Sequence, residues 1–97
     1  MIQSFGNTGT EDIFNGKDTR AARSLCPVSL WRLAARKLER LDSIEYLQEL
    51  RVPAGNRLEA LRGNRRGQHS IRINDQYRIC FTWVDAGPQN VEVVDYH

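Results

Sequence analysis

Cysteine is scarce in this sequence of 97 residues, and long apolar runs are missing altogether. Two cysteines, Cys26 and Cys80, are too few for a disulfide framework, so we expect buried or unused thiols. No apolar stretch approaches the roughly 20 residues that a membrane-spanning helix needs. The first residues lack the basic start and apolar core of a secretory signal. We therefore expect a cytoplasmic protein without membrane contact, folded as a single domain over residues 1–97.

Motifs for nucleotides, metals and covalent catalysis are also missing. Gly63 and Gly67 lack the spacing and the lysine of a phosphate-binding loop. The cysteines and histidines form neither a CxxC nor an HExxH pattern, so no metal or other cofactor is predicted. Cys80 and His69 could meet in a sheet, but a strand cysteine is usually a small buried hydrophobe and such a histidine is usually packed. We therefore assign no cysteine nucleophile.

The first half of the chain has the patterns of short helices. Residues 2–5 could form a short strand. Thr10, followed by two acidic residues, is expected to cap a helix that ends at Gly16, because acids oppose the positive end of the helix dipole. Residues 17–26 are polar and are expected to be irregular.

From Pro27 onward the spacing predicts an amphipathic helix. Asp42 and Glu45 resemble a capping box, which predicts a further short helix beyond it. The apolar positions that define these two helices are Leu30, Leu33, Ala34, Leu38 and Leu41, followed by Ile44, Leu47 and Leu50.

After residue 56 the apolar residues tend to alternate with polar ones, a pattern typical of strands, which are predicted over 57–61, 69–73, 77–83 and 91–94. The expected fold is α+β: a short N-terminal strand and two or three helices packed on one face of a mainly antiparallel sheet of three to four strands. If Ile79 and Phe81 face the helices, alternation places Arg78 on the other face, and Arg72 joins it opposite Ile71. We therefore expect these arginines on one uncovered surface, with a slip of one residue reversing the faces.

The positive charge is concentrated in the middle of the chain. Residues 51–78 contain seven arginines against two acids, whereas residues 79–97 contain three acids and no Lys or Arg. Arginine offers a planar fork that matches phosphate oxygens and stacks on bases. The segment is thus either a binding surface for a polyanion or simply a solvated basic face.

The last three residues combine a carboxylate, a phenol and an imidazole in Asp95, Tyr96 and His97. Histidine titrates near neutral pH, so His97 could give or accept a proton in a transition state. A polar chain end is also often frayed, and the residues alone favour that interpretation.

The run from Asn56 to Asn74, its continuation QYRICF and the closing Val94-Asp95-Tyr96-His97 closely resemble the HigB-type killer proteins of the RelE/ParE toxin superfamily. The opening Met1-Ile2-x-Ser4-Phe5 fits as well, so the resemblance covers nearly the whole chain. It implies a toxin of a type II toxin–antitoxin system that enters the ribosomal A site on the 30S subunit and cuts messenger RNA there. The resemblance further implies that the RNA 2′-hydroxyl attacks the adjacent phosphate without the help of a metal ion.

The resemblance also implies roles for individual residues. Arg62 would contact the scissile phosphate, Arg65 and Arg78 could share the developing charge, and His97 would transfer a proton with Asp95 orienting it or acting as base. Tyr96 would stack against a base or hold it in place. The arginines expected to contact RNA are Arg57, Arg65, Arg66, Arg72 and Arg78.

Glu59 departs from the family pattern, because many relatives have a histidine at this position. A glutamate could act as general base but cannot donate a proton from a cationic form, and it could also be structural. The family implies a HigA-type antitoxin with a helix-turn-helix, through which the toxin would reach operator DNA. An alternative follows: a toxin homologue that lost catalysis and acts as corepressor with its antitoxin.

Overall fold

A computed structural model describes residues 1–96 of the chain. Its helical elements are α1 (Thr8–Phe14), α2 (Arg20–Leu25), α3 (Trp31–Ser43) and the 3-10 turns η1 (Val28–Leu30), η2 (Leu47–Arg51), η3 (Ala54–Asn56) and η4 (Gly63–Arg65). Its strands are β1 (Glu59–Ala60), β2 (His69–Arg72), β3 (Tyr77–Val84) and β4 (Gly87–Asp95). None of the helices in this part of the chain is long and apolar enough to cross a membrane.

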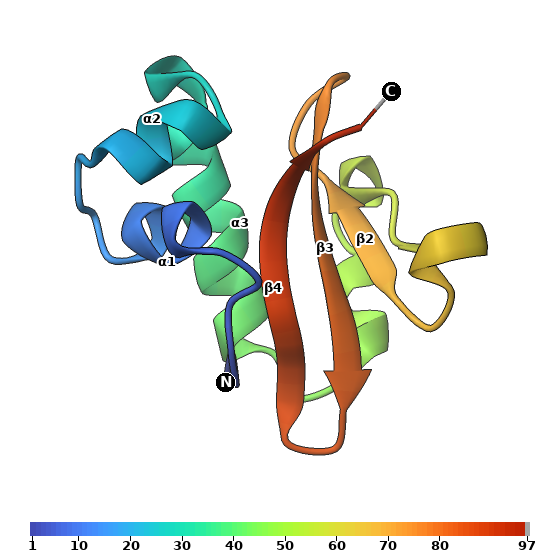
Figure 1. Ribbon diagram of the computed structural model, residues 1–97. Helices are drawn as coiled ribbons and strands as arrows, with labels where there is room; N and C mark the ends of the chain where they lie inside the picture. The colour runs from blue at the N-terminus through green and yellow to red at the C-terminus, as the bar shows by residue number, and fades with distance from the viewer. Residues whose placement is uncertain (97) are drawn as a thin grey trace.

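The four strands form one antiparallel sheet in the order β1-β2-β3-β4. The helices α1, α2 and α3 pack together on one face of it (Figure 1). The predicted α+β fold is thereby confirmed. The sheet is a meander, since strands consecutive in the sequence are neighbours in the sheet, and antiparallel neighbours need no long crossover.

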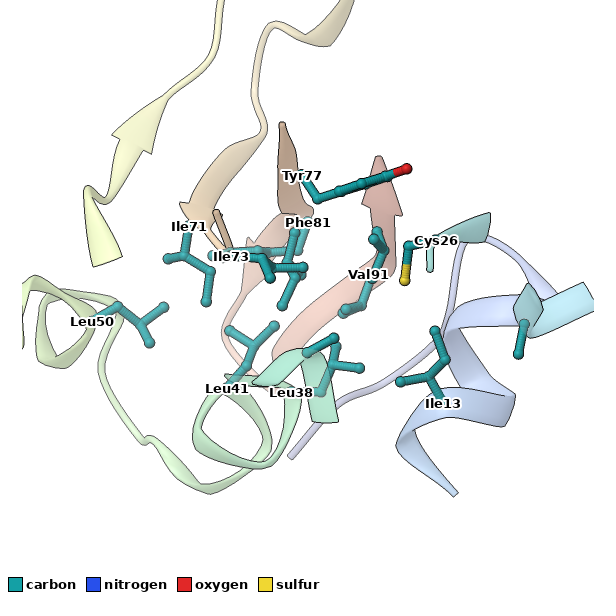
Figure 2. Packing of buried hydrophobic residues seen from close by; sticks show 14 of the residues in the cluster. Ile13, Cys26, Leu38, Leu41, Leu50, Ile71, Ile73, Tyr77, Phe81 and Val91 are labelled. Atoms are coloured by element: carbon teal, nitrogen blue, oxygen red, sulfur yellow. The ribbon is translucent and has the colours of Figure 1, made fainter. Parts of the chain in front are cut away.

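The core lies between α3 and the sheet (Figure 2). Leu38 and Leu41 of α3 are fully buried, as the spacing of three and four predicted. Ile71 of β2 lies directly across from Ile79 of β3, and Ile79 lies across from Val93 of β4. All five side chains belong to one apolar cluster, so alternation along the strands places one complete face of the sheet in the core.

The N-terminal residues follow the outer edge of β4 without forming a full strand. Phe5 makes a single parallel bridge to Val91, where Val91 N donates to the Ser4 carbonyl at 3.0 Å. Close packing continues toward the chain end: a Cβ added to Gly87, whose φ is 135°, would stand 2.2 Å from the Met1 carbonyl oxygen. Glycine is therefore the residue that fits at this position.

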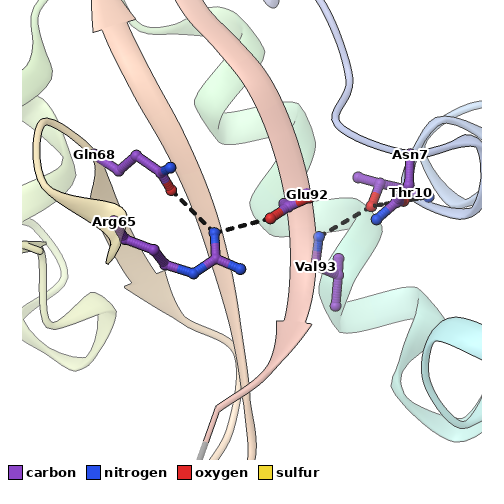
Figure 3. Close-up of polar contacts among 6 residues, drawn as sticks. All are labelled: Asn7, Thr10, Arg65, Gln68, Glu92 and Val93. Atoms are coloured by element: carbon purple, nitrogen blue, oxygen red, sulfur yellow. Dashed lines mark hydrogen bonds and ion pairs between the residues drawn. The ribbon is translucent and has the colours of Figure 1, made fainter. Parts of the chain in front are cut away.

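The cap expected at Thr10 is wrong, because Asn7 caps α1 and Thr10 lies inside the helix. The Thr10 hydroxyl is fully buried, donates to Asn7 Oδ1 at 2.7 Å and accepts from Val93 N at 3.0 Å (Figure 3). This bond fastens α1 to β4. Thr10 is used as a tertiary contact, which its local sequence does not distinguish from a cap.

Two other local expectations are also wrong. Residues 17–26 are not irregular, since Thr19 caps α2 by accepting from Ala22 N at 3.1 Å. The capping box at Asp42 does not form, because α3 continues to Ser43 and Asp42 instead accepts from Ile2 N at 2.8 Å. The next turn is η2, and the carboxylate at its start is that of Glu49.

Candidate functional site

The candidate site occupies the face of the sheet that points away from α1, α2 and α3. Ser70, Cys80 and Glu92 lie side by side across β2, β3 and β4 on this face, and Arg72 pairs with Arg78. The predicted register is therefore correct. The prediction that this surface is uncovered is wrong at Arg78, whose side chain is only 10% exposed.

Arg78 is held by several hydrogen bonds. Its Nε donates to Ser70 Oγ at 2.8 Å, and its Nη2 donates to the Arg57 carbonyl at 2.6 Å and to the Ser70 carbonyl at 3.5 Å. Glu59 Oε2 lies 3.9 Å from the same Nη2. A buried guanidinium with these partners is fixed in place, since breaking any bond would leave a buried donor without an acceptor.

Arg57 contributes its backbone to this arrangement. Its φ is 45° and its ψ is 58°, a left-handed conformation that few non-glycine residues adopt. The turn that follows η3 aims the Arg57 carbonyl at Arg78, while the Arg57 side chain is exposed. The structure thus gives Arg57 a backbone role in addition to the RNA contact expected of its side chain.

Arg65 reaches across the same face from the loop between β1 and β2. Its Nη1 donates to Gln68 Oε1 at 3.1 Å and to Glu92 Oε1 at 2.9 Å (Figure 3). The bond to Glu92 is the main cause of the raised pKa of Arg65, which keeps this guanidinium charged. About a third of the side chain, 35%, remains exposed, so Arg65 can still meet a ligand.

Cys80 lies on this face with no exposed surface. Burial raises the pKa of its thiol, and this outweighs the opposing effect of the nearby Arg65 charge. The neutral form is therefore favoured, which agrees with the prediction that Cys80 is a buried thiol and not a nucleophile.

Tyr96 places its ring beside Arg78 on this face of the sheet. Arg78 Cζ lies 5.7 Å from the centre of the Tyr96 ring, within the range of a cation–π contact. Tyr96 N donates to the Gln76 carbonyl at 2.7 Å, which ties this residue to the start of β3. Tyr96 is 42% exposed, so an aromatic residue is accessible beside a fixed positive charge.

Asp95 takes a different direction from Tyr96. It lies directly across from Tyr77, and its Oδ2 accepts from Gln76 Nε2 at 3.1 Å. Because residues directly across from each other share a face and neighbours along a strand alternate, Asp95 lies on the face of Tyr77 and not on that of Arg78. The predicted proton-transfer residue, His97, lies outside the described residues.

Three further arginines predicted to contact RNA are Arg62, Arg66 and Arg72. Arg62 and Arg66 flank η4 and are exposed, and neither has an ion pair within residues 1–96. Arg72 forms an ion pair with Asp75 and is about a third exposed, at 32%. Two arginines without ion pairs in this part of the chain therefore flank the turn that carries Arg65, and Arg72 lies across from Arg78.

The two central arginines, Arg65 and Arg78, are held by Ser70, Gln68 and Glu92, none of which was predicted as a site residue. Alternation alone places Ser70 on the same face as Arg78, but no local pattern shows that it accepts a hydrogen bond. His69 lies on the core side instead, where its ring stacks on Phe81 with 6.2 Å between centroids. Within residues 1–96, His, Cys, Asp and Glu do not gather in threes close enough to hold a metal ion.

The sequence of this chain is similar to a known protein family and to individual proteins. The family model described as the RelE-like toxin of the type II toxin–antitoxin system HigB matches residues 3–97. Toxin HigB-1 of Vibrio cholerae is 51% identical over 62 residues, an alignment that covers 64% of this chain and 65% of that protein, just under two thirds of its length. An uncharacterized protein of Haemophilus influenzae is 37% identical over 68 residues, or 70% of this chain and 67% of that protein. The family match spans nearly the whole sequence, and the chain belongs to the HigB-like family of RelE-like toxins of type II toxin–antitoxin systems.

Proposed function

We propose that this protein is an endoribonuclease that cuts messenger RNA in the A site of the 30S ribosomal subunit and so inhibits translation. The observation that carries this proposal is the arrangement of Arg65, Arg78 and Tyr96 on one sheet face. Two fixed guanidinium groups and a half-exposed ring suit a phosphate with an adjacent base. The family membership supports the same conclusion.

The proposed reaction is an internal transfer at phosphorus. The RNA 2′-oxygen loses its proton to a base and forms a bond to the adjacent phosphorus. The bond from phosphorus to the 5′-oxygen breaks, and that oxygen takes a proton from an acid. The products are a 2′,3′-cyclic phosphate and a 5′-hydroxyl, so the step is balanced without a metal ion.

The described residues suit the electrostatic part of this reaction. Negative charge grows on the phosphate in the transition state, and preorganised donors there contribute more than mobile ones. Arg62 is exposed and free to approach the scissile phosphate, and Arg65 is oriented by Glu92. Arg78 holds Tyr96 through its ring and adds a fixed positive charge behind it.

Proton transfer belongs to the C-terminal residues in this proposal. His97 serves as the acid, and Asp95 orients it or acts as base. Tyr96 stacks on a base of the messenger and fixes the position of the sugar. A positioned acid or base contributes about 10²–10⁴ in rate, so its loss is measurable.

Glu59 has two possible roles, which one substitution distinguishes. Its carboxylate is half exposed and 3.9 Å from Arg78, so it can accept a proton from the 2′-hydroxyl or serve as a charge partner of the arginine. Glu59→Gln keeps the shape and removes the basicity. Loss of cleavage in a protein of unchanged stability would assign the base, and loss of stability would assign the structural role.

The proposal includes partners from the family. The toxin is cytoplasmic and is neutralised by a HigA-type antitoxin with a helix-turn-helix, and the complex of the two binds operator DNA. The competing function is that of a corepressor without catalysis, and the replacement of the histidine found in many relatives by Glu59 is the observation that favours it.

Mapping of messenger 5′ ends after brief induced expression tests the proposal. We expect new cuts within translated frames, absent when translation initiation is blocked and absent in His97→Ala. Cuts that persist under the block would show a nuclease that does not need the ribosome. A soluble protein that produces no new cuts in cells without antitoxin would assign the corepressor function instead.

A further inference from the structure

A pocket on α3 is separate from the arginine face, the sheet face that carries Arg65 and Arg78, and none of its lining residues belongs to the candidate site. It has a volume of about 320 Å³ and lies between α3 and the segment that carries η3. Its lining residues are Leu33, Arg36, Lys37, Arg40, Pro53 and Asn56. The four residues from α3 recur at spacings of three and four, so they form one stripe along the helix.

The wall opposite α3 is fixed by a buried amide. Asn56 is 1% exposed, and its Nδ2 donates to the Leu50 carbonyl at 3.2 Å and to the Val52 carbonyl at 3.4 Å. Its Oδ1 accepts from Lys37 Nζ, which joins this wall to α3. The pocket therefore exists before any ligand binds. Val52, which precedes the lining residue Pro53 in the sequence, is 70% exposed.

Positive charge accumulates around this pocket. Arg36 is exposed and has no ion pair within the described residues, and Arg40 reaches only the Glu49 carbonyl, at 3.5 Å. The pKa of Lys37 is lowered by burial and by the charges of Arg72 and Arg36. Glu49 is the acid that faces Arg40, and its carboxylate is already bound by the backbone N–H groups of Glu45 and Tyr46.

We propose that this α3 pocket binds a segment of the antitoxin in which an apolar side chain is flanked by carboxylates. The inference rests on the proposed function for the existence of that partner. The apolar side chain covers Leu33 and Pro53, and the carboxylates pair with Arg36 and Arg40. Ribosomal RNA would use the same cations but would leave the apolar surface uncovered, so an acidic peptide is the better match.

Calorimetric titration of the toxin with the antitoxin encoded beside it tests the assignment. Arg36→Glu/Arg40→Glu replaces attraction by repulsion, so we expect affinity to fall by about tenfold or more. Arg36→Ala/Arg40→Ala should weaken binding less, and Leu33→Ala should weaken it without a change in salt dependence. The matched control is Lys17→Glu/Arg20→Glu, which alters net charge equally at two exposed positions outside the pocket and should bind like the wild type.

Sedimentation of the same variants with 30S subunits separates the two kinds of partner. An Arg36→Glu/Arg40→Glu protein that melts like the wild type and keeps full antitoxin affinity would overturn the inference, and loss of 30S binding in that protein would assign the surface to RNA. Wild-type toxin that fails to bind the antitoxin would instead refute the pairing on which the inference rests. Retained binding to 30S with weakened binding to the antitoxin is the expected result.

Discussion

The Nη2 atom of Arg78 donates a hydrogen bond of 2.6 Å to the carbonyl of Arg57, a residue whose backbone is left-handed. Through this bond the turn after η3 and the start of β3 fix each other. The Arg57 carbonyl can point at the guanidinium only because the chain reverses locally at a φ of 45°. The arrangement of the arginine face therefore depends on a backbone conformation as much as on side chains.

A first prediction concerns this conformation. Arg57→Gly should keep the free energy of unfolding within about 1 kcal/mol of the wild type, because glycine adopts positive φ without strain but loses more entropy on folding. Arg57→Val should lower it by roughly 1–3 kcal/mol, because a β-branched residue is strained there. Urea denaturation of both proteins measures the difference. Equal stability of the valine and glycine variants would show that the left-handed conformation is not retained.

A second prediction concerns the other partner of Arg78. Ser70→Ala leaves the Arg78 Nε–H without its acceptor in a buried place, which should lower the free energy of unfolding by about 1.5–3 kcal/mol. The control is Ser29→Ala, since Ser29 is exposed in η1 and should tolerate the change. Denaturant unfolding of the two variants provides the measurement. If both variants unfold at the same denaturant concentration as the wild type, the Ser70 bond contributes nothing to stability.

Alternation along β2 and β3 predicted which side chains face the helices, because period two is fixed by the pleat of a strand. The burial of Arg78 could not be predicted in this way, since its acceptor at Arg57 lies 21 residues earlier and depends on a turn. The sequence also gave no sign of α2, in which Ala22 is the one buried residue. A helix with so small an apolar face has no detectable period.

A third prediction concerns the two cysteines. Burial raises the pKa of the thiols of Cys26 and Cys80, so less thiolate is present at pH 8 than at an exposed cysteine, whose ordinary pKa is 9.0. Because thiolate is the nucleophile, alkylation of the folded protein by iodoacetamide should be slow and should become fast in denaturant. Single Cys26→Ala and Cys80→Ala variants assign the rates. Rapid labelling of folded protein at Cys80 would show that the arginine face opens readily.

The same shifts fix the sign of a pH effect on stability. A raised thiol pKa in the folded state means that each cysteine contributes stability below its unfolded pKa and loses it as pH rises through the folded value. Replacing both thiols by alanine should therefore flatten the decline in the free energy of unfolding above about pH 9. Lys37, whose pKa is lowered, makes the free energy of unfolding rise with pH, and it does so equally in the wild type and in the double variant. An unchanged slope in the double variant would contradict this assignment.

The fourth prediction separates catalysis from folding at the two ends of the proposed site. Arg62→Ala removes an exposed cation with no ion pair within residues 1–96, so the protein should melt like the wild type while growth arrest is lost. His97→Ala should behave in the same way, because it removes the proposed acid. Removal of a general acid lowers the rate by about 10²–10⁴, enough to abolish arrest at low expression. Growth curves with matched protein levels provide the measurement. A folded His97→Ala protein that arrests growth as strongly as the wild type would transfer the proton-transfer role to another residue, with Glu59 the first to test.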